Sequence, residues 1–257
     1  MSLPTFTTLG AGPTVLLLHG EAGGHLAFAP QVESLAMAGY RAVAWDMPGY
    51  GQSPPIEPYA FKGLAQRCVA LVEALQAGPV ALIGHGMGGM VAQEVVARRP
   101  ELVGRLVLCG TRAALDEADR AGFVARRTAL LDEGRDMAGL AEVQVPQWIG
   151  HAAMPEGVRL AQHAMGMVHA STYRRALQAM AAFDRRDGLA RIHVPTLLLA
   201  GEHDREVPPA VMRDMARRIP GSTFLEMRGI GHLQNLEAPD DFDGALLNFL
   251  ALPRLLH

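Results

Sequence analysis

Short apolar runs bounded by Gly, Pro or Asp recur along the chain. In order, they are "TVLLLHG", "YRAVAWDMPG", "PVALIGHG", "LVGRLVLCG", "VPTLLLAGEHD" and "STFLEMRG". Each run is too short for a typical helix and is rich in Val, Ile or Leu, as expected of strands that are covered on both faces of a sheet. The pattern therefore predicts a set of buried β-strands.

Longer segments of helical character lie between these runs. The candidates are Leu26–Ala38, Phe61–Gln76, Val91–Arg98, Ala210–Ile219 and Phe242–Leu250. Alternation of strand and helix predicts an α/β fold, in which a mostly parallel sheet is flanked by helices on both faces. A chain of 257 residues is long enough for one such domain, alone or with a small accessory domain.

The alternation stops between about residues 112 and 187. This stretch is rich in Ala, Met, Arg, Gln and His, with Pro146 and Pro155 as expected breaks. We predict several short helices, inserted after one core strand and lying over the carboxyl edge of the sheet. The predicted division is a core of residues 1–111 and 188–257 and a helical lid, or cap, of residues 112–187.

Composition narrows the functional classes. The net charge is −3, and this lack of a basic surplus argues against nucleic acid or an anionic membrane as a partner. The first ten residues have neither the basic nor the apolar region of a secretory signal. We expect a soluble, cytoplasmic protein in which Cys68 and Cys109 are buried thiols rather than a disulfide. The oligomeric state is not readable from the sequence.

The stretch "ALIGHGMGGMVAQE" joins an apolar strand to a helix through a glycine-rich turn. A G-x-S-x-G sequence in this position would be a nucleophile elbow, in which the central side chain is presented at a sharp turn. Here the central residue is Gly86, which has no side chain. Taken alone, the turn is equally compatible with an ordinary strand-to-helix connection or a phosphate-binding loop.

Two later residues favour the elbow. Asp204 follows the strand of "LLLAGEHDREVPP", and His232 follows the last strand in "FLEMRGIGHLQNLEAP". Each residue alone would be read as a capping carboxylate or a packed loop histidine. Together they give the chain order elbow, acid, histidine, which is the order of the α/β-hydrolase catalytic triad.

With these motifs, the chain resembles the α/β-hydrolase superfamily over nearly its whole length outside the lid. "LLLHGEAGG" is similar to the oxyanion loop of that family and "WDMPGYGQS" to its D-x-P-G-x-G-x-S turn. Within the superfamily, the stretches around Asp204 and His232 resemble 3-oxoadipate enol-lactonases and hydrolases of aromatic ring-cleavage products. The N-terminal strand pair of the family is shortened here, since only about Thr5–Leu9 precedes the first core strand.

The resemblance implies cofactor-free hydrolysis of an ester, a lactone or a carbon–carbon bond next to a carbonyl, in a small-molecule substrate. In that chemistry a serine attacks, a histidine takes its proton and a carboxylate orients the histidine. Asp204 and His232 match the last two, while Gly86 marks the nucleophile position. The backbone N–H groups of Met87 and Glu21 are the expected oxyanion donors.

Three interpretations of Gly86 remain open. The glycine is a change that inactivates a Ser-His-Asp hydrolase, so that the site binds substrate and turns it over very slowly. Alternatively the glycine is native, and His232 with Asp204 activates water or abstracts a substrate proton, as in cofactor-independent lyases and oxygenases. The third interpretation is a non-catalytic binder of small molecules.

Glu21 is unusual in an oxyanion loop, because a carboxylate that pointed inward would repel an oxyanion. We expect its side chain to point away, towards a surface arginine. The alternative is that it fills the space left at Gly86 and acts as a base. His85 is expected to pack beneath the elbow.

Other lid and charged residues are less specific. The lid residues that suit an apolar roof or helix packing are Trp148, Met154, Met165, Met167, Met180, His151, His163 and His169. No spacing among them indicates a metal site. Arg185 and Arg186 are read as a solvated charge run, with attraction of a substrate carboxylate as the alternative.

Overall fold

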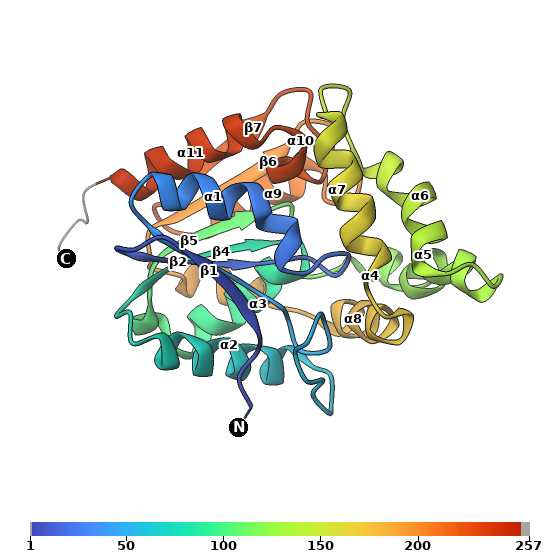
Figure 1. Ribbon diagram of the computed structural model, residues 1–257, viewed down its shortest axis with the longest axis horizontal. Helices are drawn as coiled ribbons and strands as arrows, with labels where there is room; N and C mark the ends of the chain where they lie inside the picture. The colour runs from blue at the N-terminus through green and yellow to red at the C-terminus, as the bar shows by residue number, and fades with distance from the viewer. Residues whose placement is uncertain (1, 253–257) are drawn as a thin grey trace.

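The computed structural model describes residues 2–252, which form a seven-stranded sheet with helices on both faces (Figure 1). The strand order is β1-β3-β2-β4-β5-β6-β7. All neighbouring strands run parallel except β1, which pairs antiparallel with β3. The strands are β1 (Phe6–Leu9), β2 (Thr14–Leu18), β3 (Arg41–Trp45), β4 (Val80–His85), β5 (Val103–Cys109), β6 (Thr196–Gly201) and β7 (Thr223–Met227).

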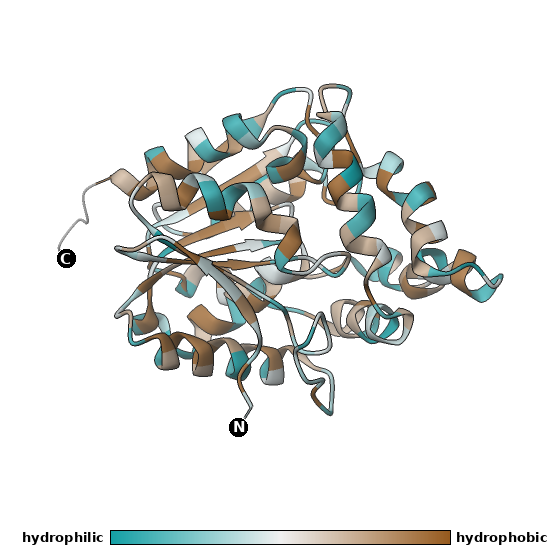
Figure 2. Ribbon diagram, viewed as in Figure 1, coloured by the Kyte–Doolittle hydropathy of each residue, from teal (hydrophilic) through white to brown (hydrophobic). Residues whose placement is uncertain are grey.

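The helices that alternate with these strands cover the two faces of the sheet. Helices α1 and α11 pack on one face, and α2, α3 and α9 pack on the other (Figure 1). Their bounds are α1 (Ala29–Met37), α2 (Phe61–Leu75), α3 (Met87–Arg98), α9 (Pro209–Arg218) and α11 (Pro239–Ala251). The central strands are brown in Figure 2 because both of their faces are apolar and buried, as their sequence pattern predicts.

The predicted α/β-hydrolase fold, with its mostly parallel sheet, is confirmed. The shortened N-terminus provides a single strand, β1, whose residues are all exposed. The α3 prediction began four residues too late, because Met87 to Met90 are already helical despite two glycines. A one-turn helix, α10 (Gln234–Glu237), and the 3-10 helices Pro100–Leu102 and Arg186–Arg191 were not predicted, since such short turns show no periodic pattern. The 3-10 helix His25–Phe28 lies mostly within the predicted helix Leu26–Ala38, most of which is α1.

A set of helices is inserted in the chain after β5 and before β6. In space these helices lie at the carboxyl end of the sheet (Figure 1). We call them the inserted helices: α4 (Glu117–Arg120), α5 (Phe123–Asp132), α6 (Met137–Trp148), α7 (Pro155–Gly166) and α8 (Ala170–Ala182). The expected break at Pro155 is the start of α7. The expected break at Pro146 is wrong, because this proline lies inside α6. Burial of Leu140, Val145 and Trp148 on that helix outweighs the hydrogen bond lost at the proline.

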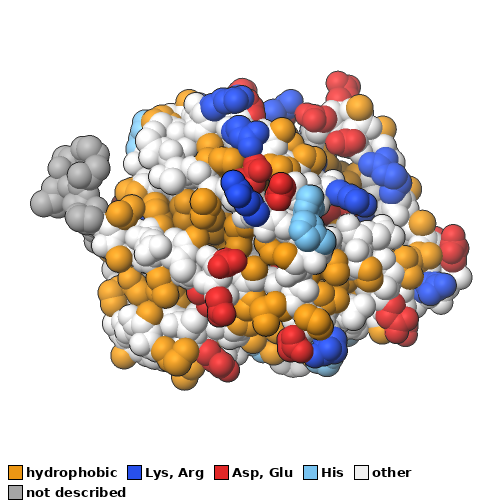
Figure 3. Space-filling view, turned by 90° about the horizontal axis from the view of Figure 1, so that it is seen from above, with side chains coloured by type: hydrophobic (Ala, Val, Ile, Leu, Met, Phe, Trp, Pro, Cys, Tyr) orange, Lys and Arg blue, Asp and Glu red, His pale blue; other side chains and the backbone are white. Residues whose placement is uncertain are grey.

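Three further observations concern the cysteines, the surface charges and the length of the apolar helices. Cys68 and Cys109 are both buried and free, as predicted. Acidic and basic side chains are mixed on the face of the molecule seen in Figure 3, in keeping with the small net charge. No helix within residues 2–252 is both long enough and apolar enough to cross a membrane.

Candidate active site

The turn between β4 and α3 has the geometry of a nucleophile elbow. Gly86 sits at its apex with φ 53° and ψ −120°, a conformation that residues with side chains rarely adopt. Close backbone packing explains the flanking glycines. A Cβ atom on Gly84 would lie 2.5 Å from the carbonyl oxygen of Gly88, and one on Gly88 would overlap the carbonyl group of Leu18.

The space above Gly86, unlike that at its neighbours, has room for a side chain. A Cβ atom built on Gly86 would lie 3.4 Å from Oε2 of Glu21, 3.6 Å from Cα of Gly20 and 3.9 Å from Nε2 of His232. All three are ordinary van der Waals distances. We call this point the nucleophile position. It faces the imidazole of His232 directly.

His232 and Asp204 form a buried pair at the ends of neighbouring strands. The Nδ1 atom of His232 lies 2.8 Å from Oδ2 of Asp204. The other carboxylate oxygen of Asp204 accepts hydrogen bonds from the backbone N–H groups of Glu206 at 2.9 Å and Val207 at 2.8 Å. Because these bonds fix the carboxylate, Asp204 holds the imidazole with Nε2 turned towards Gly86.

Two opposing effects set the charge of His232. Burial, the largest single effect, disfavours the charged imidazole, whereas the carboxylate of Asp204 favours it through its charge and its hydrogen bond. Glu206 and Glu21 add to the second effect, and the pKa of His232 lies above its ordinary value. The ring is therefore a good proton acceptor once it is neutral.

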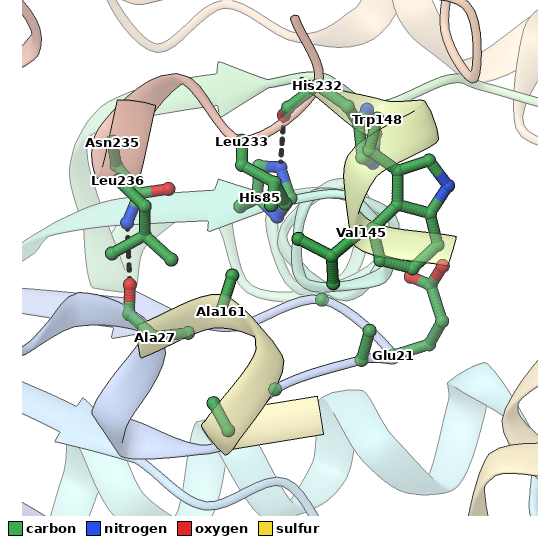
Figure 4. Close-up of a pocket in the computed structure, with 14 residues that line it drawn as sticks. Glu21, Ala27, His85, Val145, Trp148, Ala161, His232, Leu233, Asn235 and Leu236 are labelled. Atoms are coloured by element: carbon green, nitrogen blue, oxygen red, sulfur yellow. Dashed lines mark hydrogen bonds between the residues drawn. The ribbon is translucent and has the colours of Figure 1, made fainter. Parts of the chain in front are cut away.

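His85 lies beside the elbow and contacts His232. The sequence had led us to expect this side chain beneath the turn instead. Its Nε2 atom donates a hydrogen bond of 2.8 Å to the backbone carbonyl oxygen of His232 (Figure 4). Burial, with a smaller contribution from the neighbouring His232, lowers the pKa of His85 to about 4. His85 is therefore neutral near pH 7. Its hydrogen bond supports the loop of residues 228–233 between β7 and α10, which carries His232 and which we call the histidine loop.

The expectation that the side chain of Glu21 points away from the site is wrong. Glu21 is buried, and its Oε1 atom lies 2.6 Å from Nη2 of Arg127 on α5. Its Oε2 atom is the one that faces the nucleophile position. Burial, the largest single effect, raises the pKa of Glu21, but the positive charge of Arg127, with smaller contributions from His232, His85 and a backbone hydrogen bond, brings it below its usual value. A buried cation, rather than a surface one, thus holds an ionised carboxylate inside the site.

Arg127 is a site residue that sequence reasoning missed. Its guanidinium group also pairs with Glu206, donates to the hydroxyl of Tyr173 at 3.2 Å and lies 4.8 Å from the ring centroid of Trp148. Its sequence position could have indicated this, because Arg127 lies four residues after Phe123 and four residues before Leu131. This spacing places its charge on the buried face of α5.

Two small cavities meet at His232 and Glu21. The first has a volume of about 40 Å³ and is largely apolar; its lining includes Val145, Trp148, Ala161, Leu233 and Leu236 (Figure 4). The second has a volume of about 20 Å³ and is charged; its lining includes Gly86, Arg112, Met180 and Glu206 as well as Arg127. The inserted helices and the loops at the strand ends therefore enclose the nucleophile position together.

Several residues named from the sequence lie elsewhere. Of the residues that the sequence assigned to a lid, Trp148 and Met180 line the two cavities, whereas Met154 and Met167 are exposed. Arg185 pairs with Glu94, and Arg186 pairs with Asp184, and neither lines the two cavities. Within residues 2–252, no group of three or more His, Cys, Asp or Glu side chains could hold a metal ion.

This chain is similar to known proteins over most of its length, and not only at this site. The model of the alpha/beta hydrolase family matches residues 15–245. A putative carbamate hydrolase, RutD, from Pseudomonas syringae is 30% identical over 248 residues, which cover 93% of this chain and 94% of the relative. A thermophilic esterase structure from Thermogutta terrifontis, with malate bound, is 28% identical, with a TM-score of 0.87 over 96% of this chain and 92% of the esterase. The enol-lactonase of Burkholderia xenovorans shares the fold, with a TM-score of 0.85, 24% identity and coverage of 96% of both chains.

Proposed function

This chain belongs to the alpha/beta hydrolase family, and from that premise we propose that it hydrolyses a small carbonyl compound with water itself as the nucleophile. One observation carries the proposal. The nucleophile position above Gly86 lacks a side chain yet faces Nε2 of His232, whose other nitrogen is bonded to Asp204. We assign His232 as the base, Asp204 as its orienting acid and the nucleophile position as the place of the attacking water.

In the proposed reaction, a water molecule at the nucleophile position attacks the carbonyl carbon and gives a proton to Nε2 of His232. The Nδ1–H group of His232 remains bonded to Asp204, which stabilises the imidazolium that forms. The imidazolium then gives its proton to the leaving group as the bond between the carbonyl carbon and that group breaks. No covalent intermediate forms, in contrast to the serine mechanism.

Charge on the carbonyl oxygen needs its own acceptors. The Met87 N–H is in the first turn of α3, where N–H groups have no acceptor within the helix. The peptide that joins Gly20 and Glu21 is next to the nucleophile position, with Cα of Gly20 3.6 Å from it. We assign these two N–H groups, of Met87 and Glu21, as the oxyanion donors. Arg127 neutralises the carboxylate of Glu21, which would otherwise repel the oxyanion.

The substrate class follows from the cavities and the relatives. Small cavities favour a substrate of few non-hydrogen atoms, with an apolar part against Trp148 and a polar part towards Arg112 and Arg127. A relative named as a putative carbamate hydrolase and a similar structure named as an esterase both suggest a carbonyl bonded to oxygen or nitrogen. We therefore propose a small ester, lactone or carbamate, and we propose that residues 112–187 form the cap over it.

The hydrolysis of p-nitrophenyl acetate tests the proposal. The wild-type chain should release p-nitrophenol steadily, faster than buffer and without an initial burst. Gly86→Ser should restore the covalent route, with a burst of one equivalent per site and a rate higher by roughly two to three orders of magnitude. The acyl-enzyme should be recovered by acid quench and mass spectrometry from Gly86→Ser alone.

The control variants separate the alternatives. His232→Ala should reduce the rate to that of buffer, whereas His163→Ala, which changes an exposed histidine of α7, should not alter it. Equal rates for wild type and His232→Ala would overturn the proposal. If the wild-type chain is no faster than buffer while Gly86→Ser is active, Gly86 has inactivated a serine hydrolase. If both are inactive, proton abstraction or binding becomes the better interpretation.

A further inference from the structure

The two carboxylate oxygens of Glu21 have different environments. Oε1 lies 2.6 Å from Nη2 of Arg127, which is on α5 in the inserted helices. Oε2 is turned towards Gly86 and would lie 3.4 Å from a Cβ atom there. Nε2 of His232 lies 3.9 Å from the same point. Two hydrogen-bond acceptors therefore lie close to one position.

This arrangement suits water better than it suits a serine side chain. A serine hydroxyl has one proton to donate and is held in place by its covalent bond to the backbone. A free water molecule has no such bond, so that its orientation must come from hydrogen bonds. Water has two protons, and donating both of them to fixed acceptors directs a lone pair of its oxygen towards the remaining open side.

We propose that the carboxylate of Glu21 is a second catalytic acceptor for the attacking water, and that Arg127 holds it at the nucleophile position. The proposal rests on the function proposed above. The water donates one hydrogen bond to Nε2 of His232 and one to Oε2 of Glu21. During attack the proton of the first hydrogen bond is transferred to His232. Glu21 stays ionised, and its hydrogen bond orients the water. The remaining hydroxide oxygen forms the bond to the carbonyl carbon.

The charges around Glu21 agree with a role in orienting water, with His232 as the group that takes the proton. Arg127 is the nearest cation, and His232 and His85 are the other titratable groups that favour the charged carboxylate. Because the pKa of Glu21 is lowered and that of His232 is raised, the proton moves to the histidine rather than to the carboxylate. Arg127 is a positioning residue, since its guanidinium acts through Glu21.

Glu21 and Gly86 are two unusual features of the sequence that lie next to each other in the structure. A glycine at the nucleophile position and a glutamate in the oxyanion loop are each unusual for the family that this chain resembles. A Cβ atom at residue 86 would be in van der Waals contact with Oε2 of Glu21, at 3.4 Å. The carboxylate therefore faces the position that the missing side chain leaves to water.

A double-mutant cycle between residues 21 and 86 tests the catalytic role. Glu21→Gln should lower the rate of p-nitrophenyl acetate hydrolysis about 10²-fold in the wild-type background, the size of loss expected when a reacting group is misplaced. In the Gly86→Ser background, where the nucleophile is covalently held, the loss should be at least tenfold smaller. The matched control is Glu94→Gln, which alters another buried carboxylate that pairs with arginines, Arg98 and Arg185, away from both cavities. Its losses should be equal in the two backgrounds.

A second measurement tests the placement of Glu21 without any turnover. Gly86→Cys puts a thiol at the nucleophile position, and the pH dependence of its alkylation by iodoacetamide gives its pKa. Removing a neighbouring negative charge favours the thiolate. Adding Glu21→Gln to Gly86→Cys should therefore lower the thiol pKa by at least about one unit, whereas adding Glu94→Gln should not change it.

The outcomes distinguish the two proposals. A thiol pKa that Glu21→Gln leaves unchanged overturns the placement of the carboxylate and with it this inference. Equal losses in the two backgrounds of the cycle overturn the catalytic role while the proposed function stands. A shifted thiol pKa in a chain that hydrolyses no ester overturns the proposed function and the catalytic role, and retains only the placement.

Discussion

The Oε2 atom of Glu237 accepts a hydrogen bond of 2.7 Å from the backbone N–H of Gly150, which ties the histidine loop to the end of α6. The same carboxylate accepts the N–H groups of both neighbours of His232, from Gly231 at 2.8 Å and from Leu233 at 2.8 Å. One buried side chain thus fixes the backbone on either side of His232.

Glu237→Gln should disturb this anchor. An amide nitrogen cannot accept a hydrogen bond, so at least one buried N–H group loses its partner, at a cost of about 1–3 kcal/mol in the free energy of unfolding. The rate of ester hydrolysis should fall with it, because His232 is held less firmly. Urea unfolding and the ester assay measure the two effects. Glu226→Gln, which alters a surface pair with Arg213, should change stability by less than about 0.5 kcal/mol.

The pH dependence of hydrolysis should follow His232. The imidazole must be neutral to accept a proton, and its pKa lies above the ordinary value of 6.5. The rate should therefore rise with pH through a midpoint above 6.5. Asp204→Asn removes the main cause of the raised pKa, so that the midpoint should move down while the plateau rate falls by about 10⁴-fold. A midpoint that Asp204→Asn leaves in place would contradict the assignment.

The same pKa gives a prediction for stability. A raised pKa in the folded state means that the charged His232 contributes stability that is fully present below pH 6.5 and is lost as the pH rises through the folded value. The destabilisation caused by Asp204→Asn should therefore be larger on the acidic side of this window than on the basic side. Urea unfolding at about pH 6 and about pH 8 measures the difference.

The elbow and the His–Asp pair were predictable because each depends on local sequence. Strand ends, glycines that allow close packing and the order of Gly86, Asp204 and His232 can all be read along the chain. The direction of the Glu21 side chain could not be read in this way, because it is set by Arg127, which lies 106 residues away. Pro146 was misjudged because packing of α6, rather than local preference, decides the outcome there.

The glycines of the elbow should differ in their tolerance of substitution. Gly86→Ser meets no close contact, and its cost should be confined to backbone strain of about 1–3 kcal/mol. Gly88→Ala would overlap the carbonyl group of Leu18, and the chain should fail to fold or melt far lower. Thermal melts of the two variants test this contrast. Equal destabilisation would mean that the turn is not built as described.

Arg127→Met should be strongly destabilising, and in a way that depends on pH. It leaves two carboxylates, Glu21 and Glu206, without their buried cation, which costs about 3–5 kcal/mol for a broken buried pair. The control Arg185→Met breaks the pair with Glu94 outside the site, where Arg98 still binds the same carboxylate, and should cost less.

The pH dependence of Arg127→Met follows from Glu21. In the wild type its pKa is lowered, so the pair contributes stability that is present above the ordinary value of 4.5 and is lost as the pH falls through the folded value. In the variant, burial is no longer opposed by Arg127, and His232 and His85 are the titratable groups that still favour the charged carboxylate. Its pKa should therefore rise above that of the wild type, and the deficit in stability should grow as the pH rises from the region of 4.5. Urea unfolding of both proteins across this range measures the deficit. A deficit that is independent of pH would show that Glu21 is not the group that Arg127 keeps ionised.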